Sequence, residues 1–360
     1  MPRFIAFYLP QFHPTPDNDA WWGKGFTEWV NVAKARPLYR GHVEPHIPAD
    51  LGFYDLRLPE IREQQSELAK EAGIEGFCYY HYWFGNGKEI LERPFDEVVS
   101  SGKPNFPFCL CWANHSWYKK LWDPKVKGKD TLLAEQLYPG IEDYTAHFNR
   151  LLPAFKDERY MKVNNKLIFI IYDAIKFEDV STFVQLWRKL AKEHGLNDFY
   201  FISTDQDSRN KTKIKARGID AIYNSDQFNI HHHLSLFTKI RLLIQRKYLG
   251  MPTVFEYSEA CKYMINDDCY SNDTIPCILP NWDHSPRSGR NAIILKNATP
   301  KTFKSLVKRA IEVVSKKPKD EQIVIVKSWN EWGEGNYMEP DLEFGKGFIQ
   351  AMKEAIDESK

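Results

Sequence analysis

The sequence contains no long apolar run. None of its 360 residues belongs to a stretch approaching the roughly 20 apolar residues that a membrane-spanning helix needs. The first apolar run, Phe4 to Leu9, is too short for the core of a secretion signal, and no small-residue cleavage pattern follows it. We therefore expect a chain without a transmembrane segment or signal peptide, and a cytoplasmic location.

An excess of charge of one sign is also absent. The chain has 49 Lys and Arg residues against 48 Asp and Glu residues, which leaves a formal net charge of +1. This balance argues against a nucleic-acid partner, which a basic surface would mark. No long block of like charge is present either, so a solvating charged tail is not expected.

Paired cysteines and glycine-rich phosphate loops are missing too. The six cysteines form no C-x-x-C pair, and several lie in apolar strand patterns, which predicts buried free thiols in a reducing compartment. They are Cys78, Cys109, Cys111, Cys261, Cys269 and Cys277. No glycine-rich loop follows a predicted strand, which argues against nucleotide binding. Because no linker, repeat or low-complexity segment interrupts the chain, residues 1–360 are predicted to form one domain.

Aromatic residues, by contrast, are abundant. The chain has 11 Trp, 18 Tyr and 23 Phe, and many of these rings are expected to fill a core. Several clusters, however, combine Trp with His, Asn and Glu, a mixture that a core does not require. A saccharide site does require it, because aromatic rings lie against the C–H faces of sugars while polar groups bind the hydroxyls.

Eight short runs rich in β-branched and aromatic residues, each bounded by turn residues, predict strands. Several are almost continuously apolar, which is typical of strands covered on both faces. In chain order the predicted strands are Arg3–Leu9, Gly73–Tyr80, Phe106–Trp112, Lys166–Tyr172, Asp198–Thr204, Ile219–Ser225, Thr274–Pro280 and Gln322–Trp329.

Apolar positions at helical spacing, with capping residues at their ends, predict helices between these strands. The clearest are Leu58–Ala72, Ser181–His194, Pro300–Ser315 and Gly347–Ile356. Alternating strands and helices predict an α/β fold with a parallel sheet, and eight strands predict its closure into a (β/α)8 TIM barrel. Two long connections, residues 10–57 after strand one and 113–165 after strand three, are expected to be functional loops.

Aromatic, His, Asn and acidic residues recur where the predicted strands end. Active sites of α/β barrels lie at the C-terminal ends of the strands, so we expect these clusters to converge on one saccharide site. Trp83 or Trp112 is expected to form a wall on which a sugar stacks. The predicted substrate-binding residues are Tyr8, Gln11, His13, Trp22, Glu28, Tyr80, His81, Trp83, Trp112, Asn114, Tyr172, Trp282, Asp283, Arg287, Trp329, Asn330 and Trp332.

The end of predicted strand eight carries two glutamates, Glu331 and Glu334. Glycoside cleavage needs two carboxyl groups, one protonated and one charged, and burial with mutual repulsion separates the pKa values of such a pair. An isolated E-x-x-E is usually a solvated feature of a helix surface. Here the strand-end position, the flanking Trp329 and Trp332 and the turn-forming Gly333 favour a catalytic role.

The segment SWNEWGEG at residues 328–335, followed by Glu339-Pro340, resembles the catalytic signature of glycoside hydrolase family 99, the endo-α-mannosidases and endo-mannanases. The whole chain is similar to the WbsX-like proteins of bacterial polysaccharide and O-antigen gene clusters, which carry a domain of that kind. The similarity runs from near residue 4 to near residue 345. It also rests on Ala6–Pro14, Trp21–Trp29, Tyr80–Phe84 and Cys111–Asn114.

This resemblance implies a (β/α)8 barrel that acts on an oligo- or polysaccharide in polysaccharide or lipopolysaccharide metabolism, without metal or other cofactor. It implies retaining chemistry on 1,2-trans bonds such as α-mannosides. Glu331 would take the proton of the substrate's own 2-hydroxyl, whose oxygen displaces the leaving group to form a 1,2-anhydro sugar. Glu334 would act as the acid and then as the base for incoming water.

The sequence departs from the family 99 pattern at two places near the glutamates. Gly333 stands where those hydrolases typically carry His, and Asn336-Tyr337 stands where a Thr-Gln pair is usual. These differences bear on which sugar is bound. The hydrolases are also usually secreted or lumenal, so the missing signal segment fits a biosynthetic role, and WbsX-like proteins are often labelled glycosyltransferases.

Three functions are therefore open: a family-99-type hydrolase or transglycosylase, a glycosyltransferase with an activated sugar donor, and a non-catalytic carbohydrate-binding barrel. For the second, Asp205 and Asp207 resemble a metal-binding D-x-D pair, although such short triplets are usually solvated. The run His231–His233 is interpreted as a surface feature and not a metal site. Arg287 and Arg290 either hold an anionic group or are solvated.

Overall fold

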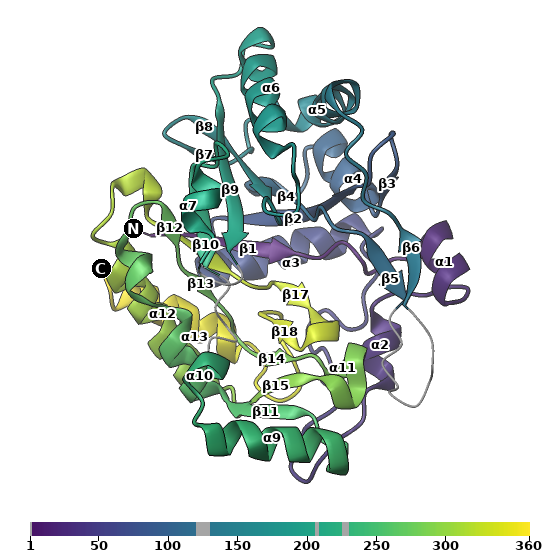
Figure 1. Cartoon of the computed structure of the whole chain (residues 1–360), viewed down its shortest axis with the longest axis vertical. Helices are drawn as coiled ribbons and strands as arrows, with labels where there is room; N and C mark the ends of the chain where they lie inside the picture. The colour runs from purple at the N-terminus through teal and green to yellow at the C-terminus, as the bar shows by residue number, and fades with distance from the viewer. Residues whose placement is uncertain (1, 120–129, 206–208, 225–229) are drawn as a thin grey trace.

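A computed structural model describes residues 2–119, 130–205, 209–224 and 230–360, and within them nine parallel strands form a nearly closed barrel (Figure 1). Every neighbouring pair in this barrel runs parallel. In spatial order the strands are β12 (Thr274–Ile275), β10 (Ala221–Asn224), β9 (Phe199–Asp205), β8 (Lys166–Ile171), β4 (Phe108–Trp112), β2 (Gly76–Trp83), β1 (Arg3–Tyr8), β16 (Ile323–Val326) and β13 (Cys277–Ile278).

Strands β12 and β13 flank Pro276 and together occupy the seventh position of the barrel. Proline has no backbone N–H to give to a sheet ladder, so a strand breaks where it stands. β12 pairs with β10 on one side, and β13 pairs with β16 on the other. The predicted eight-strand (β/α)8 barrel is therefore confirmed, with its seventh strand in two pieces.

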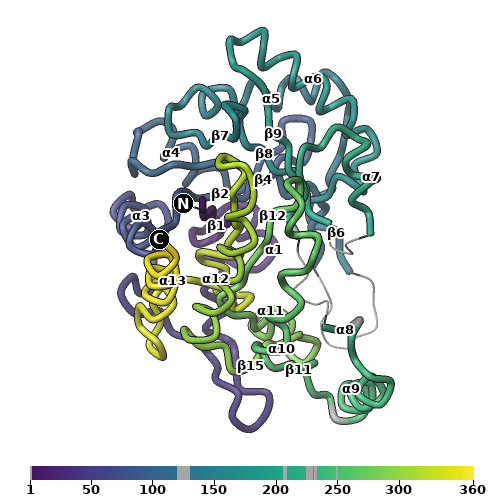
Figure 2. Tube along the Cα trace, turned by 90° about the vertical axis from the view of Figure 1, so that its left-hand side faces the viewer, coloured from purple at the N-terminus to yellow at the C-terminus, as the bar shows by residue number. Residues whose placement is uncertain are grey.

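Helices on the outside connect successive barrel positions (Figures 1 and 2). The predicted helix at Leu58–Ala72 begins at Pro59 and ends against Gly73, whose left-handed conformation (φ 84°) stops it. The connecting helices are α3 (Pro59–Ala72), α4 (Arg93–Ser101), α5 (Ile141–Phe155), α6 (Val180–Glu193), α7 (Lys211–Lys215), α10 (Tyr257–Met264) and α12 (Pro300–Val314), and a further helix, α13 (Gly347–Asp357), follows the last barrel strand.

Several predicted boundaries were wrong by a few residues. Strand β2 ends at Trp83 and not at Tyr80, and strand β4 starts at Phe108 and not at Phe106. Strand β2 starts at Gly76 and not at Gly73, because Gly73 caps the preceding helix. Helix α6 is capped at Asp179 and not at Ser181. Strand β16 ends at Val326, three residues before the predicted end, and the chain then turns into a short hairpin of β17 (Asn330–Glu331) and β18 (Asn336–Tyr337).

The long connections leave the barrel at the C-terminal ends of its strands. The two that were predicted carry α1 (Pro16–Trp22) and α2 (Trp29–Lys34) after β1, and β5 (Trp117–Lys119) and β6 (Thr131–Ala134) after β4. The sequence reasoning did not predict two others. They carry α8 (Ile230–His233), α9 (Leu236–Leu249) and β11 (Thr253–Glu256) after β10, and β14 (Trp282–Asp283), α11 (Ser285–Ser288) and β15 (Ile293–Lys296) after β13.

The remaining elements are short. Strand β3 (Glu89–Ile90) pairs antiparallel with the end of β2, and β7 (Lys162–Val163) pairs antiparallel with β8. Strands β11, β15 and β14 form a small separate sheet. The 3-10 turns are η2 (Asp267–Tyr270), η3 (Gly289–Asn291), η4 (Lys319–Glu321) and η5 (Trp332–Glu334).

Large aromatic side chains fill the barrel. Phe7 stacks on Tyr80 with ring centroids 5.1 Å apart and meets the edge of Tyr223 at 5.5 Å. All six cysteines are buried free thiols, as predicted. Among the described helices, none has the length and apolar content needed to cross a membrane.

Candidate active site

A cavity of about 980 Å³ opens at the C-terminal end of the barrel strands. Its walls come from the connection after β1, from the ends of β2, β4 and β8, from α11 and from the hairpin after β16. The structure thus brings together many of the residues predicted to bind substrate or act on it. Those that line the cavity are Gln11, Trp22, Glu28, Tyr80, Asn114, Tyr172, Arg287, Glu331 and Glu334.

The hairpin after β16 holds the two glutamates at the cavity. Glu331 is the last residue of β17, and Glu334 closes the 3-10 turn η5, which Gly335 ends in the left-handed conformation (φ 51°). Asn330 fixes this hairpin to the end of β1. Its side-chain amide accepts the Leu9 N–H at 2.7 Å and donates to the Leu9 carbonyl at 3.1 Å.

Arg287 links Glu334 to a third acid, Glu28. Its Nε donates to Glu28 Oε1 at 2.8 Å, and its other guanidinium nitrogen pairs with Glu334 Oε1. The side chain of Glu28 is only 2 % exposed, so this is a buried ion pair at the cavity wall. An arginine side chain that contacts two carboxylates holds both of them in place.

Gly333 gives the Glu28 carboxylate its space. A Cβ atom at position 333 would come within 1.8 Å of Glu28 Oε1 and 3.1 Å of Arg287 Nε. The residue between Trp332 and Glu334 therefore cannot carry a side chain while Glu28 holds Arg287. This accounts for glycine where the family 99 hydrolases typically have His.

The two glutamates have pKa values shifted in opposite directions. Burial and the charge of Glu334 raise the pKa of Glu331, and the opposing effects of Lys327 and Arg287 are smaller. Burial also acts to raise the pKa of Glu334, but Arg287, His284 and Lys327 together lower it well below the ordinary value. The carboxyl groups hydrogen-bond to each other. The pKa values of the two carboxyl groups are thus driven apart, which favours a pair with one protonated and one charged member.

The sequence matches the family described as glycosyltransferase WbsX over residues 4–352. The chain belongs to this family. It is 33 % identical over 355 residues to "Uncharacterized protein WxcX" of Xanthomonas campestris pv. campestris, strain B100, and the match covers 98 % of the chain but 49 % of that protein. The chain thus spans about half the length of the curated relatives it matches.

Solved structures with a fold similar to that of this WbsX-family protein include the following two. A glycoside hydrolase-like protein superposes with a TM-score of 0.62 at 15 % identity, covering 98 % of this chain and 93 % of that one. A GH99 endo-alpha-mannosidase from Bacteroides thetaiotaomicron gives 0.57 at 14 % identity, covering 99 % and 97 %. At such identities the likeness establishes the fold. The predicted resemblance to WbsX-like proteins with a family-99-like barrel is confirmed.

Lys327 is a cavity residue of this WbsX-family protein that the sequence reasoning missed. It is buried, with its Nζ 5.1 Å from the centre of the Trp282 ring. Burial acts to lower the pKa of its ammonium group. Tyr172, Glu331 and Glu334 together outweigh burial and raise that pKa above its ordinary value, so Lys327 keeps its charge. A lone lysine in the apolar strand pattern Gln322–Trp329 was the signal that could have revealed it.

Most of the other cavity-lining residues that the sequence reasoning missed belong to the long connections. Tyr82 and Trp117 meet edge to face at 5.0 Å, and Trp22 stacks on Phe26 at 5.7 Å. They give the cavity aromatic walls. The further lining residues not predicted are Leu9, Phe26, Asn31, Lys34, Tyr82, Ala113, His115, Ser116, Trp117, Tyr118, Leu133, Gln136, Tyr138, Asp173, Lys176 and His284.

The structure places Trp83 and Trp112 outside the cavity, packed towards the helices. Trp83 lies flat on the His147 ring, and the Trp112 indole donates to the Trp83 carbonyl at 2.8 Å. Successive side chains of a strand point to opposite faces. Tyr80 and Tyr82 of β2 therefore face the cavity, while His81 and Trp83 face outward. This geometry does not support the predicted stacking wall.

Other predicted site residues lie outside the cavity lining and make contacts within the protein interior. The Tyr8 hydroxyl donates to Gln65 at 2.6 Å, and His81 shares a 2.8 Å hydrogen bond with His147. The Trp332 indole donates to Glu339 at 2.6 Å. Trp282 lies under Lys327. The predicted residues that do not line the cavity are Tyr8, His13, His81, Trp83, Trp112, Trp282, Asp283, Trp329, Asn330 and Trp332.

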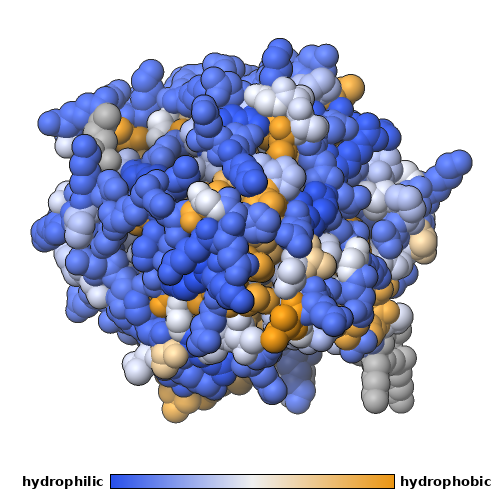
Figure 3. Space-filling view, turned by 90° about the horizontal axis from the view of Figure 1, so that it is seen from above, coloured by the Kyte–Doolittle hydropathy of each residue, from blue (hydrophilic) through white to orange (hydrophobic). Residues whose placement is uncertain are grey.

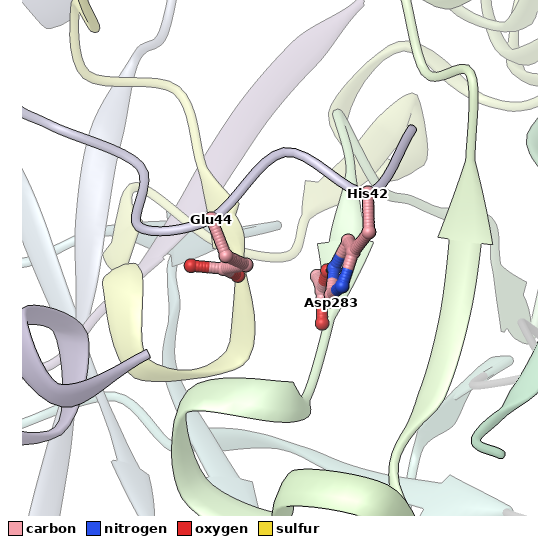
Figure 4. Close-up of side chains that lie close together, drawn as sticks. All are labelled: His42, Glu44 and Asp283. Atoms are coloured by element: carbon pink, nitrogen blue, oxygen red, sulfur yellow. The ribbon is translucent and has the colours of Figure 1, made fainter. Parts of the chain in front are cut away.

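Among the described residues, His42, Glu44 and Asp283 form the one cluster with metal-ligand side chains (Figure 4). His42 Nδ1 accepts the Leu38 N–H at 3.0 Å, so the ring carries its proton on Nε2 and donates it to Asp283 at 2.6 Å. A neutral His with that tautomer has no free nitrogen for a metal. The cluster is a hydrogen-bonded His–Asp pair beside a carboxyl whose pKa is raised by burial and by Asp283.

Asp205, His233 and Arg290, which belong to the weaker sequence signals, lie on separate elements of the described part of the chain, β9, α8 and η3. Asp205 ends β9, and its carboxylate accepts the Asn210 N–H at 2.8 Å. Asp207 lies outside the described residues, as do the side chains of His231 and His232. The His233 ring stacks on Tyr263 at 4.2 Å. Arg290 is exposed, whereas Arg287 lines the cavity.

Proposed function

We propose that this WbsX-family protein is a retaining glycoside hydrolase or transglycosylase. Its substrate is a saccharide with a 1,2-trans, α-mannoside-like bond, in bacterial polysaccharide or lipopolysaccharide metabolism. The observation that supports this most is that Glu331 and Glu334 lie together at the wall of an aromatic-lined cavity, with pKa values shifted in opposite directions. Glycoside cleavage requires that combination of a charged and a protonated carboxyl group.

In the proposed reaction Glu331 accepts the proton of the substrate 2-hydroxyl, and that oxygen attacks C1. The bond from C1 to the leaving oxygen breaks as Glu334 protonates it, which leaves a 1,2-anhydro sugar. Glu334 then takes a proton from water or from an acceptor hydroxyl, whose oxygen attacks C1. The bond from C1 to the 2-oxygen breaks, and that oxygen recovers its proton from Glu331.

These roles require the shared proton to move before the reaction. The raised pKa of Glu331 and the lowered pKa of Glu334 favour the proton on Glu331 in the free protein, whereas the reaction needs it on Glu334. The hydrogen bond between the two carboxyl groups offers a direct path. Arg287 keeps its second partner, Glu28, when Glu334 becomes neutral, so the guanidinium is not left unpaired.

A glycosyltransferase with an activated sugar donor is the second candidate, favoured by the description of the family. Lys34 and Lys327 line the cavity and suit an anionic donor. In that case turnover requires a sugar nucleotide, and the glutamate pair binds the acceptor sugar.

The deciding experiment is a turnover screen of the purified protein. α-Mannosides and other 1,2-trans glycosides are offered with and without divalent metal and sugar nucleotides. We expect cleavage or transfer that needs neither, and a drop in kcat/KM of about 10²–10⁴-fold in Glu331→Gln and Glu334→Gln. Glu312→Gln, an exposed glutamate on α12, is the matched control.

Substrates with an acidic leaving group separate the two roles. Such a leaving group needs little protonation, so it should restore activity to Glu334→Gln but not to Glu331→Gln. Equal recovery of both variants contradicts the role assignment. Turnover only with a nucleotide donor contradicts the proposal and identifies a glycosyltransferase. Saccharide binding without turnover under any condition identifies a binding protein.

A further inference from the structure

Helix α9 presents an apolar stripe to solvent. Leu236, Phe237 and Leu243 are 75 %, 78 % and 65 % exposed, and Tyr248 is 71 % exposed. Ile240 and Ile244 on the same helix are about half exposed. Large exposed apolar side chains are rarely concentrated in this way on a protein surface that has no partner.

The six exposed apolar residues all lie on one side of the helix. At about 100° per residue, the six fall on an arc of roughly 140°. Leu242, which packs against the core, lies nearly opposite the centre of that arc. The helix is therefore held to the protein by one face and turns its second apolar face outward.

Basic side chains accompany this stripe. Lys239 and Arg246 lie along one edge, Arg241 lies along the other, and Lys247 lies within it; all four are exposed. The stretch 230–250 contains no acidic residue. Among the described residues, no carboxylate forms an ion pair with any of these four cations.

Helix α9 lies at the periphery of the molecule, at the end away from α5 and α6 (Figures 1 and 2). The surface on the α5 and α6 side is mostly hydrophilic, with apolar residues in small separate areas (Figure 3). Because α9 follows β10, its connection leaves the barrel at the end where the catalytic cavity opens.

We infer that α9 docks this protein on the surface of an anionic phospholipid bilayer. An apolar stripe edged by Lys and Arg matches a bilayer interface, in which acyl chains lie beneath negatively charged headgroups. A second copy of the chain is a poor match, because it would bring four more cations against these four with no acid between them.

Docking places the cavity end of the barrel near the headgroups, within reach of a saccharide carried by a lipid. This consequence rests on the proposed function, but docking itself does not. Glu331→Gln should therefore bind vesicles as the wild type does, which separates failure of the docking proposal from failure of the catalytic one.

Flotation with vesicles tests the docking. The whole chain is mixed with vesicles of equal parts phosphatidylglycerol and phosphatidylcholine, or of phosphatidylcholine alone. We expect it to float with the anionic vesicles only, and less so at high salt. A double variant that carries both Phe237→Glu and Leu243→Glu should no longer float with the vesicles. Replacing Lys239 and Arg246 by Gln should lower the coefficient for partition onto anionic vesicles roughly fivefold per residue.

Two exposed sites on other helices provide matched controls. Ile141→Glu on α5 and Lys192→Gln on α6 should leave flotation unchanged. The docking proposal is wrong if the wild type does not float with anionic vesicles, or if the Phe237 and Leu243 variant floats equally well. Self-association that this variant abolishes, in a protein that binds no vesicles, would assign the stripe to a second copy and overturn the proposal.

Discussion

At the scale of single residues, the site is an arrangement of charges that balances when the glutamate pair keeps one proton. The cations are Arg287 and Lys327, and the anions are Glu28 and Glu334. Ionising Glu331 as well would add an uncompensated charge in a buried cluster, which is costly. This is the physical reason why the pKa of Glu331 is raised.

Replacing Arg287 by Met should raise the pKa of Glu334, because its guanidinium is the largest charge effect lowering that pKa. Activity needs a singly protonated pair, so it falls at low pH when both carboxyls are protonated. The acid limb of the kcat/KM profile should therefore move up by roughly 1–3 pH units. Arg290→Met, at the exposed neighbouring arginine, should leave the limb in place. An unchanged limb in Arg287→Met would contradict this electrostatic account.

Glu331→Gln should be more stable than the wild type at neutral pH. The pKa of Glu331 is raised in the folded state, so the wild type loses stability as the pH rises from the ordinary Glu pKa toward the raised one. The advantage of the variant should grow by up to about 1.4 kcal/mol per pH unit over that window. Urea unfolding at several pH values measures it, and an advantage independent of pH would argue against a raised pKa.

At the scale of elements, the 3-10 turn η5 and the start of α2 constrain each other. Glu28, at the N-terminal end of α2, occupies the space over Gly333 in η5. The two lie on segments that are remote in sequence and share no hydrogen-bonded strand. The packing of Glu28 over Gly333 positions Arg287, which donates to Glu28. Arg287 also pairs with Glu334 and lowers the pKa of that carboxyl group.

Gly333→Ala should displace Glu28 and Arg287, because the new methyl group overlaps Glu28 Oε1. We expect a loss of about 1–3 kcal/mol in unfolding free energy and reduced turnover. A smaller residue at position 28 relieves the overlap, so Glu28→Ala should add little further loss of stability in the Gly333→Ala background. A double-mutant cycle measures this coupling. Strictly additive losses would show that the contact is not what requires glycine.

At the scale of the whole molecule, the first and last parts of the chain interlock. Strand β1 pairs with β16 and with β2, so the N-terminal segment lies between distant parts of the sequence. The last helix, α13, packs on both α3 and α12. An independent unit cannot be cut from such a barrel without breaking sheet pairs at its centre.

Calorimetric unfolding should therefore show one cooperative transition for the 360 residues, with equal calorimetric and van't Hoff enthalpies. This tests the prediction of a single domain. Two transitions, or a calorimetric enthalpy well above the van't Hoff value, would contradict it. Phe237→Glu, on the exposed stripe of α9, is a control that should leave the transition single.

Much of this architecture was determined by the sequence alone. Apolar strand runs and helix signals such as Thr299-Pro300 act over a few residues, and the structure has these elements within a few positions of the predicted ones. The position of Glu331 and Glu334 after the last strand was predictable for the same reason, since the C-terminal ends of parallel strands meet at one end of a barrel.

Tertiary structure alone decided which side chains reach the cavity. Period-two patterning says that Tyr80 and His81 face opposite ways, but in a strand apolar on both faces it does not say which face is inside. The state of the glutamate pair was decided in the same way. Glu28 and Arg287, 259 residues apart, set the charge of Glu334, and the Coulomb energy that does so depends on distances in space and not on separation along the chain.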